Sequence, residues 1–385
     1  MESSSIKNNV CEISYIRIDT MMKTMLFCLF VANVVLLSFS DFIYNVSARM
    51  VFPLSVAIVT VVMAVLHFAG GYKRLRPRTE DISVILFFLG TTVPALVSDV
   101  KGKAAPVTLT ANFLTMGGIY ASSRLSAVNI HTCTKLYLII ASIHSLYALC
   151  QFIPGFDHYL FFQPMDVYGQ PFMDVKRSTG LCNDPNSYGA FLAMCLCLVL
   201  VYNLGLRWVP LVILCSVGLL LSISRESIIG LGAAVVFLSF KRPTRTCIFI
   251  IIIAIIGIMI YNIIPETFQR YDPNRFSTDD NLLIRIEQWD KAIYLIRKCP
   301  MLGYGNEMPI EFTDQAYLGW LLTGGIVSAG FWIAGLIVLT LTLPRIRPFL
   351  IVITTVGLAS NPFSGPTLFL LLSVCGIGAE PAGTE

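Results

Sequence analysis

The segment LLLSISRESIIGLG, residues 219–232, places two adjacent charged side chains inside about 33 largely apolar residues. One membrane helix needs about 20 residues, so a single helix cannot use that length. The segment therefore predicts a tight hairpin of two short helices, near residues 208–222 and 226–240. Ser222 or Ser224 can cap the second helix, because a serine hydroxyl accepts a hydrogen bond from a free backbone N–H of the first turn.

The whole chain has the composition of a membrane protein. Hydrophobic residues make up 56% of its 385 residues and charged residues only 13%, whereas a soluble domain is about a quarter charged. Apolar segments of bilayer length recur from end to end, so we predict one all-α, polytopic transmembrane domain over residues 1–385. The eleven cysteines lie mostly inside apolar runs without metal-ligand spacing, which is typical of small buried hydrophobic residues.

Hydropathy predicts about twelve spans, and the basic residues predict their orientation. Most short-loop Lys and Arg residues fall on one side, which places that side and both termini in the cytoplasm. Residues 347–379 can form either two spans or one broken helix. The expected spans lie near residues 22–40, 50–70, 82–98, 105–122, 134–154, 183–203, 208–222, 226–240, 245–264, 315–340, 347–361 and 364–379.

Two long loops then lie on the outer side, at residues 155–182 and 265–314. Both are longer than a simple connection between helices requires, and long loops are often functional. A tethering loop without chemistry is the alternative interpretation.

The first outer loop ends in KRSTGLCNDPNSYG, residues 176–189. Asn183 or Asp184 can cap a descending helix, and the proline that follows suits its first turn. The free N–H groups and the positive dipole end of this helix face the loop, next to Lys176 and Arg177. This arrangement favours binding of an anion such as a phosphate. A plain helix cap with interfacial cations is the alternative.

Arg225 strengthens the anion hypothesis. The two spans of the hairpin are short, so Arg225 is expected slightly below the outer surface. An ionisable residue at that depth is costly and is a functional hypothesis by default. The alternative is a local ion pair with the neighbouring Glu226.

The second outer loop contains DDNLLIRIEQWDKAIYLIRKCPMLGYG, residues 279–305. Its apolar residues repeat at helical spacing, so we predict an amphipathic helix that begins near Asp279 and ends before Pro300. This helix can lie on the membrane or cover a cavity as a lid. Arg285 is the cation in it that we expect to take part in binding. The apolar stripe comprises Leu282, Leu283, Ile286, Trp289, Ile293 and Ile296.

The second loop ends in EFTDQAYLGW, residues 311–320, where Thr313 or Asp314 can cap a third descending helix. Three helix N-termini then face outward, each with an arginine near it. Asp314 and Glu311 supply carboxylates close by. Cations for a pyrophosphate and one carboxylate base are the minimum parts for transferring a sugar from a lipid diphosphate.

These motifs in this order resemble the O-antigen ligase and O-antigen polymerase superfamily of bacterial inner membranes. The similarity covers about residues 140–345. The quoted segments that carry it are RSTGLCNDPNSYGAFLAM, SISRESIIGL, RIEQWDKAIYLIRKCPMLGYG and TDQAYLGWLLTGGIVSAGF, which begin at residues 177, 222, 285 and 313.

The resemblance implies about twelve helices, a large outer loop and undecaprenyl-diphosphate-linked glycans as donors. It also implies metal-independent glycosyl transfer without a cofactor, with arginines at the outer face binding the diphosphate. By motif these arginines are Arg177 and Arg225. The further candidate substrate-binding residues are Lys176, Asn183, Asn186, Ser224, Arg285 and Glu311.

The chain departs from the ligases of this superfamily at one position. The resemblance implies a loop histidine as base or helper, but residues 265–314 contain none, and Asp314 stands about where it is expected. This departure favours a polymerase of lipid-linked repeats over a ligase that transfers glycan to lipid A core. A transporter with a cationic pocket is the alternative from another class, although no internal repeat is evident.

The expected partners follow from the same hypothesis. They are an undecaprenyl-diphosphate-linked oligosaccharide and the lipid bilayer, and the resemblance further implies a chain-length regulator and a flippase. Nucleic acid is not an expected partner. No metal site is expected, because the outer carboxylates are scattered and the sequence has no His/Cys cluster.

Overall fold

The computed structural model is all-helical over the residues that it describes, which confirms the all-α part of the predicted fold class, while most of the two predicted outer loops lies outside those residues. No strand occurs within this described part of the chain. The described residues are 20–36, 39, 51–69, 78–100, 105–126, 128–153, 176–182, 184–265, 280–305, 315–358, 360 and 365–378.

Each of the twelve segments expected to cross the membrane contains a helix. The helices are Thr20–Leu36, α3 (Val51–Ala69), α4 (Thr79–Val100), α5 (Ala105–Leu125), α6 (Ile130–Cys150), α7 (Pro185–Tyr202), α8 (Val209–Ser222), α9 (Arg225–Ser239), α10 (Pro243–Ile263), α13 (Ala316–Thr342), α14 (Arg347–Gly357) and α15 (Gly365–Ile377). The amphipathic helix of the second long loop is α12 (Asp280–Lys298), and two short 3-10 turns are η2 (Leu206–Trp208) and η6 (Pro344–Ile346).

Five of these helices are long and apolar enough to cross a membrane by length and composition, namely α4, α6, α7, α10 and α13. The total of twelve spans stays a prediction. Within residues 347–379 the structure describes two helices, α14 and α15, and whether they form two spans or one broken helix stays open. At about 1.5 Å per residue neither helix alone reaches the roughly 30 Å of a hydrocarbon core.

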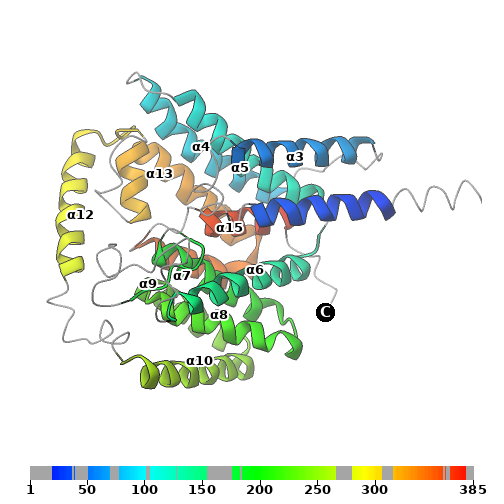
Figure 1. Cartoon of the computed structure of the whole chain (residues 1–385). Coiled ribbons are helices and arrows are strands. Elements are labelled where there is room, and N and C mark those ends of the chain that lie inside the picture. Colours follow the sequence, from blue (N-terminus) through cyan, green and yellow to red (C-terminus); the bar gives the residue numbers. More distant parts are fainter. Residues whose placement is uncertain are drawn as a thin grey trace, which may run out of the picture.

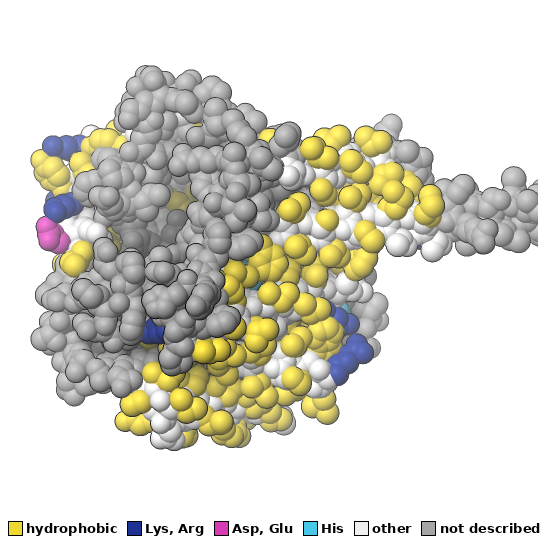
Figure 2. Space-filling model, in the orientation of Figure 1, with side chains coloured by type: hydrophobic (Ala, Val, Ile, Leu, Met, Phe, Trp, Pro, Cys, Tyr) yellow, Lys and Arg dark blue, Asp and Glu magenta, His cyan; other side chains and the backbone are white. Residues whose placement is uncertain are grey.

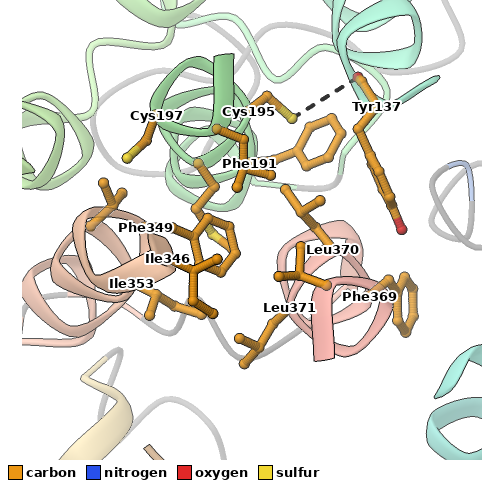
Figure 3. Packing of buried hydrophobic residues seen from close by; sticks show 14 of the residues in the cluster. Tyr137, Phe191, Cys195, Cys197, Ile346, Phe349, Ile353, Phe369, Leu370 and Leu371 are labelled. Carbon is orange, nitrogen blue, oxygen red and sulfur yellow. Dashed lines mark hydrogen bonds between the residues drawn. The ribbon is translucent and has the colours of Figure 1, made fainter. Parts of the chain in front are cut away.

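Helix α7 forms the centre of the bundle, and α10 lies at its edge (Figure 1). The apolar window of α7 is 78% buried, compared with 22% for α10. Phe191 of α7 packs with Phe349 of α14 and Leu370 of α15 (Figure 3). Helix α10 is the least buried of the five long apolar helices, and its Ile251 and Ile258 are exposed. An apolar helix that is so little buried by protein is suited to contact with lipid.

Helix α12 lies across one end of the bundle, roughly perpendicular to α6 and α10 (Figure 1). Ala292 is fully buried on its packed face, with Trp289 half-buried beside it. Ile286 and Ile293 of the predicted apolar stripe are exposed. The stripe is therefore only partly a packing face, and Figure 2 shows hydrophobic and charged side chains together on this end.

The turn after α12 docks into a break in α13. Gly325 is non-helical, with φ 63° and ψ −165°, so the helical bonds around it are interrupted. The residues after α12 satisfy the freed groups: the N–H of Ile326 donates to Pro300 O at 2.8 Å, and Leu322 O accepts from Tyr304 N at 2.9 Å. Unsatisfied backbone groups are costly in a membrane protein. These bonds therefore fix α12 across the end of the bundle.

Replacing Gly325 with alanine is expected to destabilise the protein by about 2 kcal/mol or more, because its φ and ψ belong to a region that is essentially restricted to glycine. An added Cβ would also lie 2.2 Å from Met301 O. Thermal unfolding of the purified protein in detergent measures this effect. Gly330→Ala in the same helix is the matched control, since no heavy atom lies within 4 Å of its added Cβ. Equal unfolding temperatures for both variants would contradict the expectation.

Candidate functional site

The first helix N-terminus at this end of the bundle is that of α7, and its cap is the predicted one. Asp184 occupies the N-cap position, and its carboxylate accepts a hydrogen bond from Ser187 N at 2.7 Å. Pro185 stands in the first turn, where its missing N–H costs nothing. Asn183, the alternative cap and a candidate binding residue, lies outside the described residues.

Arg177 joins the start of α7 to the end of α8. Its side chain is 5% exposed. The guanidinium donates from Nη2 to Asn186 Oδ1 at 2.6 Å and from Nε to Ser222 O at 3.2 Å. Ser178 N donates to Leu221 O at 3.0 Å. The sequence predicted both Arg177 and Asn186 as site residues, and the structure brings them into direct contact.

Gln151, at the end of α6, positions the segment that carries Arg177, and sequence reasoning did not identify it. Gln151 Oε1 accepts from Thr179 N at 3.0 Å and from Gly180 N at 3.2 Å, while its Nε2 donates to Thr179 Oγ1 at 2.9 Å. The side chain is fully buried. Gln151 is difficult to identify from sequence, because a single amide side chain after a long apolar helix is common at membrane interfaces. Lys176 is half-buried, 5.8 Å from the Phe152 ring centroid.

The α8–α9 hairpin is confirmed. Helix α8 ends at Ser222, and Ser224 caps α9 by accepting from Ser227 N, so Ser224 is the cap of the two serines that the sequence proposed. Ile223 between them has φ 51°, which is a true outlier for a β-branched residue. Backbone strain of this kind persists only where the surroundings impose it, and it occurs often at functional sites.

Gly189 allows the first turn of α7 to approach this hairpin closely. A Cβ at Gly189 would lie 2.7 Å from Ser224 Cβ and 2.8 Å from Ser222 Oγ. The absence of a side chain therefore brings the N-termini of α7 and α9 together. Arg225, the first residue of α9, is half-buried beside them.

Glu226 pairs with Arg285 of α12, which sequence reasoning did not foresee. Arg285 Nη1 donates to Glu226 Oε1 at 2.8 Å, and Ser224 Oγ donates to Glu226 Oε2 at 3.2 Å. The two charged side chains are 9% and 16% exposed. The sequence offered only the neighbouring Arg225 as partner. The sequence does show a carboxylate within an apolar hairpin. A carboxylate in such a place requires a cationic partner, but the sequence does not identify that partner.

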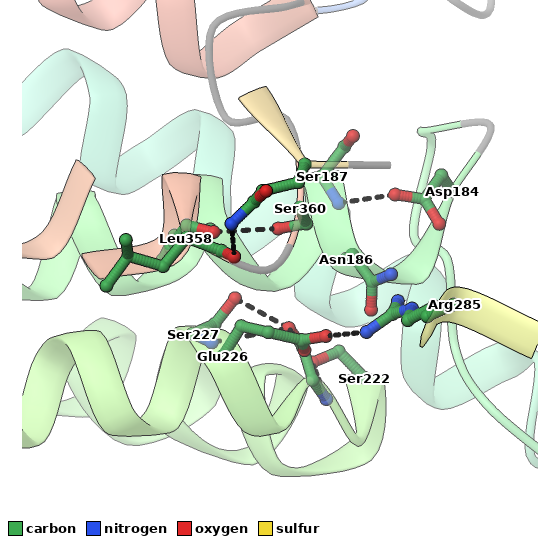
Figure 4. A network of polar contacts seen from close by, with 12 residues as sticks. Asp184, Asn186, Ser187, Ser222, Glu226, Ser227, Arg285, Leu358 and Ser360 are labelled. Atoms are coloured by element: carbon green, nitrogen blue, oxygen red, sulfur yellow. Dashed lines mark hydrogen bonds and ion pairs between the residues drawn. The ribbon is translucent and has the colours of Figure 1, made fainter. Parts of the chain in front are cut away.

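Arg177 adds a second favourable electrostatic interaction with the Glu226 carboxylate. Asn186, Glu226 and Arg285 lie together between the N-termini of α7 and α9 (Figure 4). We call Arg177, Asn186, Ser224, Arg225, Glu226 and Arg285 the polar cluster. It joins α7, α9 and α12 with the segment before α7, and it contains three cations and one carboxylate.

The start of α13 differs from the prediction. Gln315 occupies the N-cap position and makes no side-chain cap hydrogen bond, so the expectation that Thr313 or Asp314 is the cap was wrong. Instead, Ala316 N donates to Ser360 O at 3.3 Å, and the Gln315 amide donates to Leu358 O. Carbonyl groups after α14 thus replace a local cap. Asp314 and Glu311 lie outside the described residues, and their place relative to the polar cluster stays a prediction.

Residues 210–333 match the model of a family described as O-antigen ligase. The match includes Arg225, Glu226 and Arg285, whereas Arg177 and Asn186 precede it. The chain shows no significant similarity to a curated protein or to a solved structure. The apolar helices and this family together indicate a multi-pass membrane protein with ligase- or polymerase-like function. The match supports an O-antigen ligase- or polymerase-like superfamily for this chain.

Proposed function

We propose that the chain is a polymerase of lipid-linked polysaccharide repeat units, acting at the outer face of a bacterial inner membrane. The observation that carries the proposal is the polar cluster. Arg177 and Arg285, from two separate segments, both interact favourably with Glu226 in the first turn of α9, and Arg225 is the first residue of that helix. Arg225 and Arg285 lie within the region that matches the O-antigen ligase family, and Arg177 precedes it. Helix N-termini and guanidinium groups are suited to a diphosphate.

In the proposed reaction, the diphosphate of one undecaprenyl-diphosphate glycan lies between Arg177, Arg225 and the N-termini of α7 and α9. The bond between the anomeric carbon and the diphosphate oxygen breaks, and its electron pair stays on the leaving diphosphate. The hydrogen bonds from Arg177 to Asn186 and Ser222 fix its guanidinium before substrate arrives. Such preorganised donors stabilise developing charge without reorganisation at the moment of reaction.

The attacking group is a hydroxyl of the next lipid-linked repeat. Its oxygen forms the new bond to the anomeric carbon, and its proton passes to Asp314 or, alternatively, to Glu311. The growing glycan chain is thereby transferred to the incoming lipid-linked repeat, and undecaprenyl diphosphate leaves. Lys176, Asn183, Asn186, Ser224 and Arg285 are proposed to bind the substrate around this centre. This scheme requires no metal or cofactor.

The absence of a histidine from residues 265–314 supports polymerase over ligase. A ligase transferring glycan to lipid A core is the second candidate, because the matched family is described by that name. In the proposed setting both termini are cytoplasmic, and a chain-length regulator and a flippase act alongside the chain.

The decisive experiment reconstitutes the purified chain in lipid vesicles with lipid-linked repeat units and separates the glycan products on a gel. We expect a ladder of products from the wild-type chain. The Arg225→Ala variant should lose at least about 100-fold of this activity, since one donor to a developing anion contributes that much. Arg207→Ala is the control, because Arg207 is exposed at the other end of the bundle.

The alternatives give different results in the same assay. One-step transfer that occurs only when lipid A core is added would identify a ligase. No product of either kind, with a known polymerase active in parallel, would favour transport. Full activity of Arg225→Ala at normal protein level would remove Arg225 from the proposed site.

A further inference from the structure

A basic pocket opens at the end of the bundle opposite the polar cluster. Helix α7 begins at Pro185 beside Arg177 and ends at Tyr202, which lines the pocket. Eighteen residues at about 1.5 Å each separate the two ends by about 27 Å. The polar cluster and this pocket are therefore distinct places in the molecule.

The pocket has a volume of about 810 Å³, within the range of roughly 300–1,000 Å³ that is typical of small-molecule sites. Among the described residues that line it, every formally charged side chain is basic. These are Lys241, Arg242 and Arg245 from the start of α10 and the turn before it, and Arg345 from the turn before α14. Four cations gathered around one cavity favour an anionic ligand.

The backbone around the pocket reinforces this preference. Pro243, Thr244 and Arg245 form the first turn of α10 and line the pocket, while Pro348 lines it from the first turn of α14. Neither helix has a side-chain cap hydrogen bond at its N-terminus. Two positive helix ends thus contribute to the lining together with the four cations.

The cations differ in their surroundings, which assigns them different tasks. Arg242 Nη1 donates to Val201 O at 2.5 Å and so holds the end of α7. Lys241 lies 5.0 Å over the Phe237 ring. Arg245 is exposed and Arg345 is half-exposed. Arg245 lies in the first turn of α10 and Arg345 in the turn before α14, so together they can contact two sides of one ligand.

Seven of the other lining residues are apolar or aromatic, beside His131, Asn203 and Thr244, and this apolar part favours a ligand that carries hydrocarbon over a free ion. Two of the helices that line the pocket, α7 and α10, are long and apolar enough to cross a membrane. A phosphate group with acyl chains attached satisfies both parts of the lining, because basic pockets between membrane helices bind acidic lipid headgroups. The apolar and aromatic lining residues are Val201, Tyr202, Phe237, Leu238, Pro243, Pro344 and Pro348.

We propose that this pocket binds the phosphate headgroup of an anionic phospholipid, at the membrane face opposite the polar cluster. Arg245 and Arg345 donate to the phosphate oxygens, with Lys241 beside them. Arginine suits this task because its planar guanidinium contacts two phosphate oxygens at once. Binding attaches the C-terminal ends of α7 and α9 and the N-terminal ends of α10 and α14 to the lipid surface.

The test titrates dioleoylphosphatidylglycerol into the purified full-length chain in neutral detergent and follows the thermal unfolding temperature. Two parallel titrations use dioleoylphosphatidylcholine, which has no net charge, and inorganic phosphate. We expect a saturable rise with phosphatidylglycerol only, since a ligand that binds the folded state raises its stability. The Arg245→Ala/Arg345→Ala double variant should bind phosphatidylglycerol at least tenfold more weakly, and Arg207→Ala should bind as the wild type does.

Each contrary outcome overturns the proposal. Equal stabilisation by phosphatidylcholine would show that charge does not matter, and equal stabilisation by inorganic phosphate would identify a free-anion site. Unchanged binding by the double variant would also exclude the pocket. If the double variant lacks a cooperative transition, Arg245→Gln alone carries the comparison, because its side chain is exposed. The assay uses no glycan donor, so its result is independent of the proposed transferase reaction.

Discussion

Replacing Arg177 with alanine is expected to lower glycan transfer by at least about 100-fold, the usual cost of removing one preorganised donor to a developing anion. The guanidinium is buried and bonded to Asn186 Oδ1 and Ser222 O, so no other side chain takes its place. Arg177→Lys keeps the charge but loses the planar fork, and an intermediate activity is expected. Single-turnover transfer from a lipid-diphosphate donor in vesicles measures both variants.

This prediction must be separated from simple unfolding, because Arg177 also joins α7 to α8. Thermal unfolding of each variant gives that control. A folded Arg177→Ala protein without activity supports a role in binding the diphosphate. A folded variant that retains full activity would restrict Arg177 to holding the two helices together.

Breaking the Arg285–Glu226 pair is expected to have the largest effect on stability. Arg285→Met leaves the 9%-exposed Glu226 carboxylate without its closest cation, and removing one partner of a buried pair costs about 3 kcal/mol. Adding Glu226→Gln removes the uncompensated charge, so the double variant should be more stable than Arg285→Met alone. Chemical unfolding in detergent is measured for the wild type, Arg285→Met, Glu226→Gln and the double variant. The four free energies of unfolding give the coupling between the two side chains.

A matched control lies on the same helix. Arg297→Met changes an exposed arginine of α12, and such surface changes stay within about 0.5 kcal/mol. Proteolysis provides a second measurement, because loss of the pair should increase cleavage within α12 while the bundle stays intact. Additive effects of the two single changes would show that the contact contributes nothing to holding α12.

Local chemistry made much of this structure predictable from sequence. The hairpin at Ser222 to Arg225, the Asp184 cap and the bounds of α12 follow from apolar length, cap residues and helix-stopping residues that are adjacent along the chain. For the same reason Arg177 and Asn186 could be named together, since both lie within ten residues of one helix start. The span count and the orientation rest on the same patterns and stay predictions.

The pairing of distant residues was not predictable. Glu226 is 59 residues from Arg285, and a buried carboxylate requires a cation without specifying which one. The α13 cap failed for a related reason: Ser360 O and Leu358 O satisfy groups that a local side chain was expected to satisfy. The hydrogen bonds between Gln151 and Thr179 were not predictable for the same reason. They join two segments that are distant along the chain, and no local sequence pattern shows that these segments are in contact.

The sequence by itself therefore determined the helices, the caps of α7 and α9 and the arginines that precede or begin these two helices, because these features depend on neighbours along the chain. Only the tertiary structure decided that Arg285 meets Glu226, that the turn after α12 fills the break at Gly325, and that four cations surround one pocket at the other end. The physical reason is that buried charges and interrupted backbone bonds must find partners, and packing alone determines which distant groups are within reach.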